Sequence, residues 1–287
     1  MSMQGRVCVV TGANSGLGKA VTHSLAALGA TVYMLRRNRE RGEAARAEII
    51  DRSGNAQVLL EIVDMSSQAS VRAGVQRLLA QTDRLDVLIN NAGGLLNERQ
   101  TSVDGLEMTF ATNTLGYFLL TELLLPRLKA SAPSRVINVS SGGQYLAKLV
   151  VDDLQFEARP YDGVRAYAES KRAEVLLTQR WAGRLAGTGV MVQAMHPGWA
   201  RTPGVAQTLP SFFKWLWPFL RTPAQGADTI AWLAAHPHLA DAENGQFWFD
   251  RQVRPVYKWG SPRNTPEEVE RFFAACYTLT HVSPDGI

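Results

Sequence analysis

Cysteine is scarce in this sequence, where Cys8 and Cys276 are the only two among 287 residues. Cys8 lies inside an apolar run from Val7 to Val10 that is typical of a buried strand. A small secreted domain that relies on disulfides needs several paired cysteines to replace the core that it cannot build. The cysteine content therefore excludes a disulfide framework.

Long hydrophobic runs are missing as well. No stretch approaches the roughly eighteen uninterrupted apolar residues that a membrane-spanning helix requires. Residues 1–5 contain neither a charged leader nor an apolar signal core. We therefore expect no membrane span, and we expect a cytoplasmic location.

Charge of one sign is not concentrated anywhere along the chain. The 30 basic and 26 acidic residues are spread over its length and give a formal net charge of +4. Because a nucleic-acid-binding tail would need a basic block, we expect no nucleic-acid partner. The modest basic excess suits a phosphate-bearing cofactor. His236 and His238 flank Pro237 without an apparent third ligand, so we expect no metal site.

Apolar runs of strand length alternate with amphipathic segments of helix length up to about residue 250, which is the pattern of parallel βαβ units. The expected strands are 6–11, 31–35, 57–63, 87–90, 135–140, 190–196 and 246–249. The expected helices are 17–28, 39–52, 70–81, 106–129, 161–186 and 223–235. This predicts a single α/β domain with a Rossmann-like, doubly wound sheet of about seven mainly parallel strands and helices on both faces.

Residues 203–221 interrupt this alternation with an unusual density of aromatic side chains, namely Phe212, Phe213, Trp215, Trp217 and Phe219. We interpret the segment as a lid over an apolar substrate, with a subunit contact or an interfacial membrane element as the alternatives. Residues 251–287 form a C-terminal extension with a helical pattern over 266–279 and no specific chemical signal.

A glycine-rich turn follows the first expected strand and leads directly into an amphipathic helix. Glycines permit a tight turn and let backbone amides approach a pyrophosphate, while the helix N-terminus adds a favourable dipole. A plain loop is the alternative, but the position at the start of a βαβ series favours a dinucleotide site. The residues expected to bind the cofactor here are Gly12, Asn14, Ser15, Gly16, Leu17 and Gly18.

The end of the second strand indicates which nicotinamide cofactor fits. An acidic residue there would bind the adenosine ribose and repel a phosphate, but the strand ends in Arg36 and Arg37. Arginine recognises phosphate with two parallel hydrogen bonds, so Arg37, helped by Arg36 or Arg41, favours NADP(H) over a merely solvated basic loop. Asp64, after the third strand, could cap the next helix or accept a hydrogen bond from the adenine amine.

Tyr167 and Lys171 are four residues apart in a segment of helical pattern, so both side chains leave the same face of the helix. A phenol has a reference pKa near ~10 and is a poor proton carrier at neutral pH. A neighbouring ammonium can stabilise the phenolate and lower that pKa. Alone, the pair would more often be two surface residues.

With these motifs the sequence resembles the short-chain dehydrogenase/reductase family over about residues 5–250. The sequences of residues 139–143, 196–200 and 224–229 are similar to those of the retinol-dehydrogenase-like branch. Within that branch they are similar to the group called dehydrogenase/reductase SDR family member 12. The matches follow the family's order and comprise the turn from Thr11 to Gly18, Asn90 to Gly93, Asn113, Ser141, Tyr167, Lys171, Pro197 and Gly198.

The resemblance implies four catalytic residues. Tyr167 would be the general acid/base, and Lys171 would lower its pKa and hold the nicotinamide ribose. Ser141, the second serine of the pair Ser140-Ser141, would hydrogen-bond the reacting oxygen. Asn113 would distort its helix and hold a water that relays protons from the lysine, rather than being a tolerated polar interior residue.

The resemblance also implies further cofactor contacts. Asn91, Ala92 and Gly93 would line the riboses, with Asn91 alternatively only stabilising the central strands. Pro197 and Gly198 would shape a turn against the carboxamide, and Thr202 would bind that group or the phosphates, unless it is an ordinary helix cap. In this branch the long interval between Ser141 and Tyr167 borders the substrate pocket. The alternative is that it only packs against the core. Its apolar residues are Tyr145, Leu146, Leu149, Val150, Leu154 and Phe156.

The implied activity is hydride transfer between NADP(H) and a carbonyl or alcohol of a small apolar substrate. The alternative is a non-catalytic NADP(H)-binding sensor or scaffold, a class that usually lacks the Tyr/Lys pair. Dimers and tetramers are common in the family, so a homo-oligomer stays open.

Overall fold

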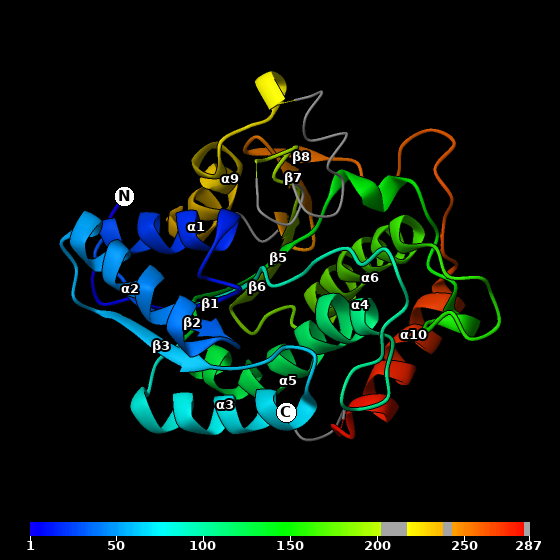
Figure 1. The fold of residues 1–287 in the computed structure, drawn as a ribbon, viewed down its shortest axis with the longest axis horizontal. Coiled ribbons are helices and arrows are strands. Elements are labelled where there is room, and N and C mark those ends of the chain that lie inside the picture. The colour runs from blue at the N-terminus through cyan, green and yellow to red at the C-terminus, as the bar shows by residue number, and fades with distance from the viewer. Residues whose placement is uncertain (202–216, 238–242, 284–287) are drawn as a thin grey trace.

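The computed structural model describes residues 1–201, 217–237 and 243–283, and Figure 1 shows its fold. Thr202 and most of the expected lid at 203–221 lie outside the described residues. The described strands form one sheet in the order β3-β2-β1-β4-β5-β6-β7-β8. Their bounds are β1 Val7–Thr11, β2 Thr31–Arg36, β3 Val58–Ile62, β4 Val87–Asn90, β5 Ser134–Val139, β6 Val190–Met195, β7 Phe247–Phe249 and β8 Gln252–Arg254.

Every neighbouring pair from β3 to β7 is parallel, and only β8 runs antiparallel, to β7. The predicted seven-stranded parallel sheet is therefore confirmed, and β8 is an additional edge strand that the sequence did not reveal. Its residues Gln252 and Val253 are exposed, so the sequence contains no buried apolar run from which this strand could be predicted.

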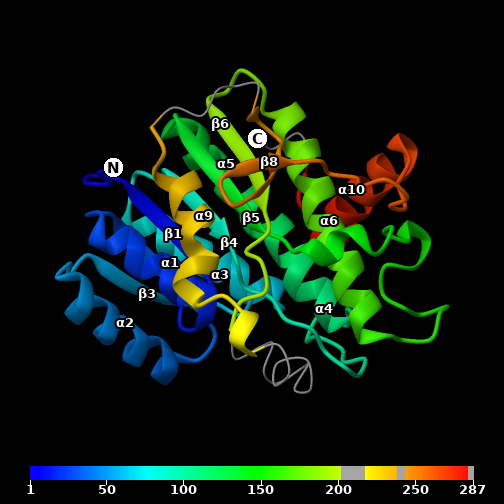
Figure 2. The ribbon, with the colours of Figure 1, turned by 90° about the horizontal axis from the view of Figure 1, so that it is seen from above.

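Helices cover both faces of the sheet, as expected for a doubly wound fold (Figures 1 and 2). The helices α1 (Gly16–Ala27), α2 (Arg39–Ser53) and α9 (Pro223–Ala235) contribute to one apolar core. The helices α3 (Gln68–Gln81), α5 (Gly116–Ala130) and α6 (Gly163–Arg184) contribute to the other, together with the C-terminal helix α10 (Pro266–Thr280). No helix among the described residues is long and apolar enough to cross a bilayer.

The central strands are buried on both faces, which explains their continuous apolar runs. Asn90 is a polar exception that is fully satisfied as a donor, because its Nδ2 donates to Thr121 Oγ1 at 3.0 Å and to Asn138 Oδ1 at 2.9 Å. Asn138 in turn donates to Thr178 Oγ1 at 2.8 Å. This polar chain links β4 and β5 to the helices α5 and α6 beneath the site.

The expected helix at 106–129 is confirmed as a helical stretch over 108–130, and a local distortion interrupts its α-helical geometry. The structure has a short helix α4 (Met108–Phe110), a π-helical segment η1 (Ala111–Leu115) and then α5. A π turn inserts one extra residue per turn and is frequent at functional sites. It contains Asn113, the residue at which a local distortion is expected.

The order of the strands reverses between β1 and β4, because β2 and β3 lie on one side of β1 and β4 to β7 on the other. In such sheets the connections after the carboxyl ends of the two central strands diverge and leave a crevice. The glycine turn after β1 and the Asn91 segment after β4 both lie at this edge. The fold therefore brings the predicted cofactor residues to one place.

Candidate active site

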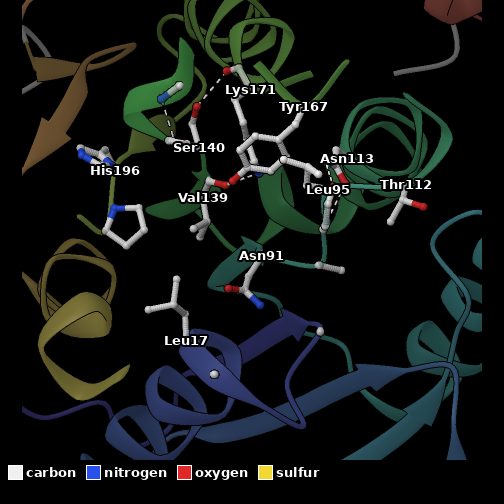
Figure 3. A pocket seen from close by; sticks show the side chains of 18 of the residues that line it. Leu17, Asn91, Leu95, Thr112, Asn113, Val139, Ser140, Tyr167, Lys171 and His196 are labelled. Atoms are coloured by element: carbon white, nitrogen blue, oxygen red, sulfur yellow. Dashed lines mark hydrogen bonds between the residues drawn. The ribbon is translucent and has the colours of Figure 1, made fainter. Parts of the chain in front are cut away.

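A cavity of about 1050 Å³ opens at the carboxyl ends of the central strands. Figure 3 shows Tyr167, Lys171 and Ser140 on one side of it and Leu17 on the other. The predicted site residues that line it are Gly12, Ser15, Gly16, Leu17, Gly18, Arg36, Arg37, Asp64, Asn91, Ala92, Gly93, Asn113, Ser141, Tyr167, Lys171, Pro197 and Gly198. Asn14 does not line it, and Thr202 lies outside the described residues.

Two glycines of the turn are required by close approaches of the backbone. A Cβ on Gly18 would lie 2.4 Å from Gly12 O and 2.5 Å from Asn91 Nδ2, so no side chain fits there. Gly12 adopts φ +66°, and a Cβ on it would lie 2.9 Å from the Cα of Ala92. Ser15 caps α1 without a side-chain hydrogen bond to the helix. The α1 N-terminus thus presents an uncovered backbone cradle that fits a pyrophosphate.

Asn91 has a structural contact in addition to its place in the cavity wall. Its Nδ2 donates to Thr11 O at 2.8 Å, while Thr11 Oγ1 accepts from the backbone amides of Asn91 and Ala92, both at 2.8 Å. These bonds join the ends of β1 and β4. The structure therefore supports the strand-stabilising interpretation of Asn91 and leaves the ribose contact as a prediction.

The basic end of the cavity contains Arg36 and Arg37 at the end of β2. Burial, followed by repulsion from Arg37 and Arg41, lowers the pKa of Arg36. The Nε of Arg36 is buried and has no hydrogen-bond partner among the described residues. A crowded guanidinium with an unsatisfied donor fits an anionic group such as a ribose phosphate.

Asp64 does not cap the helix after β3, so that alternative is wrong. The N-cap of α3 is Ser67, whose side chain accepts from the amide of Ser70. Asp64 Oδ1 instead accepts from the backbone amide of Ser66 at 3.0 Å and from its hydroxyl at 2.7 Å. The adenine contact at this cavity wall remains a prediction.

Tyr167 and Lys171 leave α6 toward the cavity as the spacing predicts. Lys171 Nζ lies 5.4 Å from the centre of the Tyr167 ring. It donates to Val139 O at 2.9 Å and to Glu174 Oε1 at 2.7 Å. Burial lowers the pKa of Lys171, but the charge of Glu174 and the nearby Tyr167 outweigh it, and the net shift is upward. Lys171 is therefore a cation at neutral pH despite being buried.

The two serines after β5 have different surroundings. Ser140 is buried, and its hydroxyl donates to Lys171 O at 2.8 Å. Ser141 caps the short helix η2 (Gly142–Tyr145), where its Oγ accepts from the Gly143 amide at 3.1 Å and lines the cavity. Both serines line the cavity, and the role of Ser141 at the substrate oxygen stays a prediction.

Asn113 connects the π turn to the cavity floor. Its Nδ2 donates to Gly94 O and to Ser170 Oγ, both at 3.0 Å, and its Oδ1 accepts from the Gly94 amide at 3.1 Å. A Cβ on Gly93 would lie 3.0 Å from Asn113 Oδ1 and 3.6 Å from Lys171 Nζ. Asn113 and Lys171 thus both lie close to Gly93, and a proton relay through a water held by Asn113 stays a prediction.

His196 organises the turn that contains Pro197 and Gly198. Its Nδ1 accepts from the Gly142 amide at 3.0 Å and from the Gly198 amide at 3.3 Å, so this nitrogen carries no proton. Burial, followed by repulsion from Arg221, lowers the pKa of His196 to about 4. His196 is therefore a neutral structural acceptor that ties the Ser141 loop to the turn.

The substrate end of the cavity is aromatic, with walls formed by Tyr145, Leu146, Trp199, Phe247 and Phe249. Of the residues expected from the interval between Ser141 and Tyr167, only Tyr145 and Leu146 line it. Leu149 and Phe156 are buried elsewhere, and Leu154 packs against the main core. Both alternatives therefore hold in part: Tyr145 and Leu146 form a wall of the pocket, and the later apolar residues of the interval pack in the interior.

Three charged residues are among the contributors to this site that sequence reasoning missed. Arg254 and Lys258 line the cavity from the C-terminal extension, where the family resemblance no longer reaches. Glu174 was missed because a glutamate in a helix ordinarily faces water. The available signal was its position three residues after Lys171, which places both side chains on neighbouring sites of one helix face.

A doubly wound sheet with a glycine cradle at its switch point and a Tyr/Lys pair across the cavity defines a dinucleotide-dependent oxidoreductase. The chain belongs to the short-chain dehydrogenase family, which its residues 6–211 match. It is 46% identical over 257 residues to bovine (Bos taurus) dehydrogenase/reductase SDR family member 12, covering 90% of this chain and 80% of that protein. It is 44% identical over 264 residues to human (Homo sapiens) retinol dehydrogenase 11, covering 88% and 82%.

Solved structures with similar folds include enzymes with either nicotinamide cofactor. The 3-ketoacyl-(acyl-carrier-protein) reductase of Brucella melitensis, complexed with NADH, aligns with a TM-score of 0.68 at 26% identity over 86% of this chain and 96% of that one. The RhlG/NADP complex of Pseudomonas aeruginosa has a TM-score of 0.68 at 27% identity, covering 84% and 94%. These matches support the fold and a nicotinamide cofactor.

Proposed function

We propose that this protein is an NADP(H)-dependent oxidoreductase that interconverts a carbonyl and an alcohol on a small apolar substrate. The observation that carries the proposal is that one cavity is lined both by the glycine cradle and Arg36-Arg37 and by Tyr167, Lys171 and Ser141. A cofactor held at the cradle would reach the catalytic residues across that cavity. When bound, the nicotinamide supplies or accepts the hydride.

The residues of the chain move and hold the proton. Tyr167 donates its phenolic proton to the substrate oxygen during reduction, or removes it during oxidation. Lys171 stabilises the phenolate through its positive charge, and Ser141 donates a hydrogen bond to the oxygen on which negative charge develops. Asn113 holds a water that returns the proton from solvent to Lys171 and Tyr167.

The preference for NADP(H) rests on Arg36 and Arg37, since no acidic residue stands at the end of β2 to accept the ribose hydroxyls. The aromatic substrate end favours an apolar ketone, aldehyde or alcohol. With NADPH as the cofactor, reduction is the expected direction in the cell.

An NADPH-oxidation screen over ketones, aldehydes and quinones, followed by the reverse assay with alcohols, tests the proposal. Turnover of at least one apolar carbonyl, absent in a Tyr167→Phe variant, supports it. NADPH binding without any turnover would favour the alternative function of a cofactor-binding sensor or scaffold.

A further inference from the structure

Glu174 is fully buried on α6, less than one helical turn from Lys171. Its Oε1 accepts from Lys171 Nζ at 2.7 Å, and its Oε2 has no hydrogen-bond partner among the described residues. A buried carboxylate with one unsatisfied oxygen is costly unless a charge compensates it. Glu174 therefore depends on Lys171, the same ammonium that the reaction needs.

Besides Lys171, the polar groups that interact with Glu174 are the Ser140 hydroxyl after β5 and Tyr117 on α5. Tyr167 on α6 interacts with Lys171 and with Tyr117. Burial, then the charge of Glu174, then Tyr167 raise the pKa of Tyr117, whose buried hydroxyl has no hydrogen-bond partner among the described residues. Within the described part of the chain, Lys171 is the one cation that acts on Glu174.

The geometry also fixes where the ammonium can point. Lys171 Nζ has three N–H donors. Val139 O and Glu174 Oε1 accept two of them, which leaves one for the cavity. The Tyr167 ring centre lies 5.4 Å from this nitrogen, and a Cβ on Gly93 would lie 3.6 Å from it.

We propose that Glu174 is a positioning residue that sets how much positive charge Lys171 presents to Tyr167 and to the nicotinamide ribose. The inference rests on the proposed function. An ionised Glu174 neutralises the ammonium and holds it toward β5, whereas a protonated Glu174 leaves the full charge at the cavity. Burial raises the pKa of Glu174 to about 8 against the opposing effects of Lys171 and Ser140, so this change falls near neutral pH.

Calorimetric titration with NADPH from about pH 7 to pH 9, a range that brackets the Glu174 transition, tests the proposal without requiring turnover. In the wild type, NADPH affinity should fall severalfold as the pH rises through about 8. In Glu174→Gln the affinity should stay level, because glutamine keeps the volume and the acceptor oxygen but cannot ionise.

A kinetic arm measures the charge felt by Tyr167. With a substrate from the screen, the apparent pKa of alcohol oxidation in Glu174→Gln should be lower by about one pH unit, because a buried negative charge no longer opposes the phenolate. A residue that only maintained packing would change the rate without moving this profile.

Glu169→Gln is the matched control. Glu169 is also buried on α6, but it pairs with Arg159 at 2.8 Å and with Arg165 at 3.0 Å, away from the cavity. Its loss should affect stability and leave both pH dependences in place. If Glu174→Gln fails to fold, the wild-type measurement tests the proposal alone: a fall in NADPH affinity through about pH 8 supports it, and an affinity that does not change with pH overturns it.

The outcomes separate the two proposals. The role of Glu174 is overturned if the wild type binds NADPH with an affinity that does not change with pH. It is also overturned if the pH dependence of the affinity is the same in the wild type and in Glu174→Gln. Either result leaves the proposed function intact. Failure of the wild type to bind NADPH at any pH overturns the proposed function, and the role of Glu174 with it.

Discussion

At the level of single residues, Tyr167→Phe removes one oxygen atom from the cavity and keeps the ring on α6. Turnover should fall by about 10²- to 10⁴-fold, the usual contribution of a positioned general acid or base. NADPH affinity should change little, because the ring still borders the cofactor site. Steady-state kinetics and cofactor titration of the variant check both halves. Near-normal turnover would mean that another group supplies the proton, and His196 is a poor substitute because its Nδ1 is occupied by two amides.

Arg37→Asp tests the cofactor preference at the end of β2. The substitution replaces a phosphate partner by a like charge, so NADPH affinity should fall about 10- to 100-fold while NADH affinity falls less or rises. Arg39→Asp, the same change two residues later at the start of α2, is the control because Arg39 does not line the cavity. Dissociation constants for both cofactors decide the matter, and an equal loss in the two variants would point to general charge rather than phosphate recognition.

His196 predicts a pH dependence of stability. Its pKa is about 4 in the folded state, below its ordinary value near ~6.5, so the unfolded chain binds the proton more readily. Stability should therefore be lost as the pH falls from about 6.5 to about 4, by on the order of 3 kcal/mol. His196→Asn keeps an acceptor oxygen and should flatten this part of the curve in denaturant unfolding. Identical slopes in the two proteins would contradict the assignment.

At the level of elements, the buried parallel strands were predictable to within one residue at either end. Their apolar runs are continuous because helices cover both faces, and glycine or polar residues mark the ends. The helices α9 and α10 were equally clear, since each begins with a capping box and a proline in the first turn.

The features that the sequence concealed depend on packing between elements. The family resemblance predicts a distortion at Asn113, but the apolar spacing of the segment is that of an ordinary helix, and the π form depends on hydrogen bonds from the Asn113 side chain to Gly94 and Ser170. Glu174 acquires its role only because α6 packs against β5 and removes its solvent. Asn14, by contrast, matched the motif, yet its Oδ1 is buried without a partner among the described residues.

At the level of the whole molecule, the C-terminal extension is part of the fold rather than an appendage. The helix α10 lies beside α6 in Figure 1 and buries Phe272, Phe273 and Cys276 in the core that α5 and α6 share. The Phe118 ring on α5 meets the Phe273 ring edge-on, with 5.3 Å between centroids. The C-terminal end of α10 is held to α3, because Gln68 Nε2 on α3 donates to Leu279 O at 2.9 Å.

Phe273→Ala should therefore destabilise the protein by about 3 to 5 kcal/mol, the usual cost of a buried phenylalanine. Glu270→Ala is the control on the same helix, because Glu270 is exposed and its ion pair with Arg180 should contribute less than about 1 kcal/mol.

Removing the chain from Thr265 onward should destabilise the protein further and expose Phe118 and Trp181, whose rings stack with 5.9 Å between centroids beneath α10. An exposed aromatic face of this kind promotes association. Denaturant unfolding of the three variants and light scattering of the truncated chain measure these effects. A truncated chain that keeps wild-type stability and the same number of chains per particle as the wild type would show that α10 is dispensable for the core.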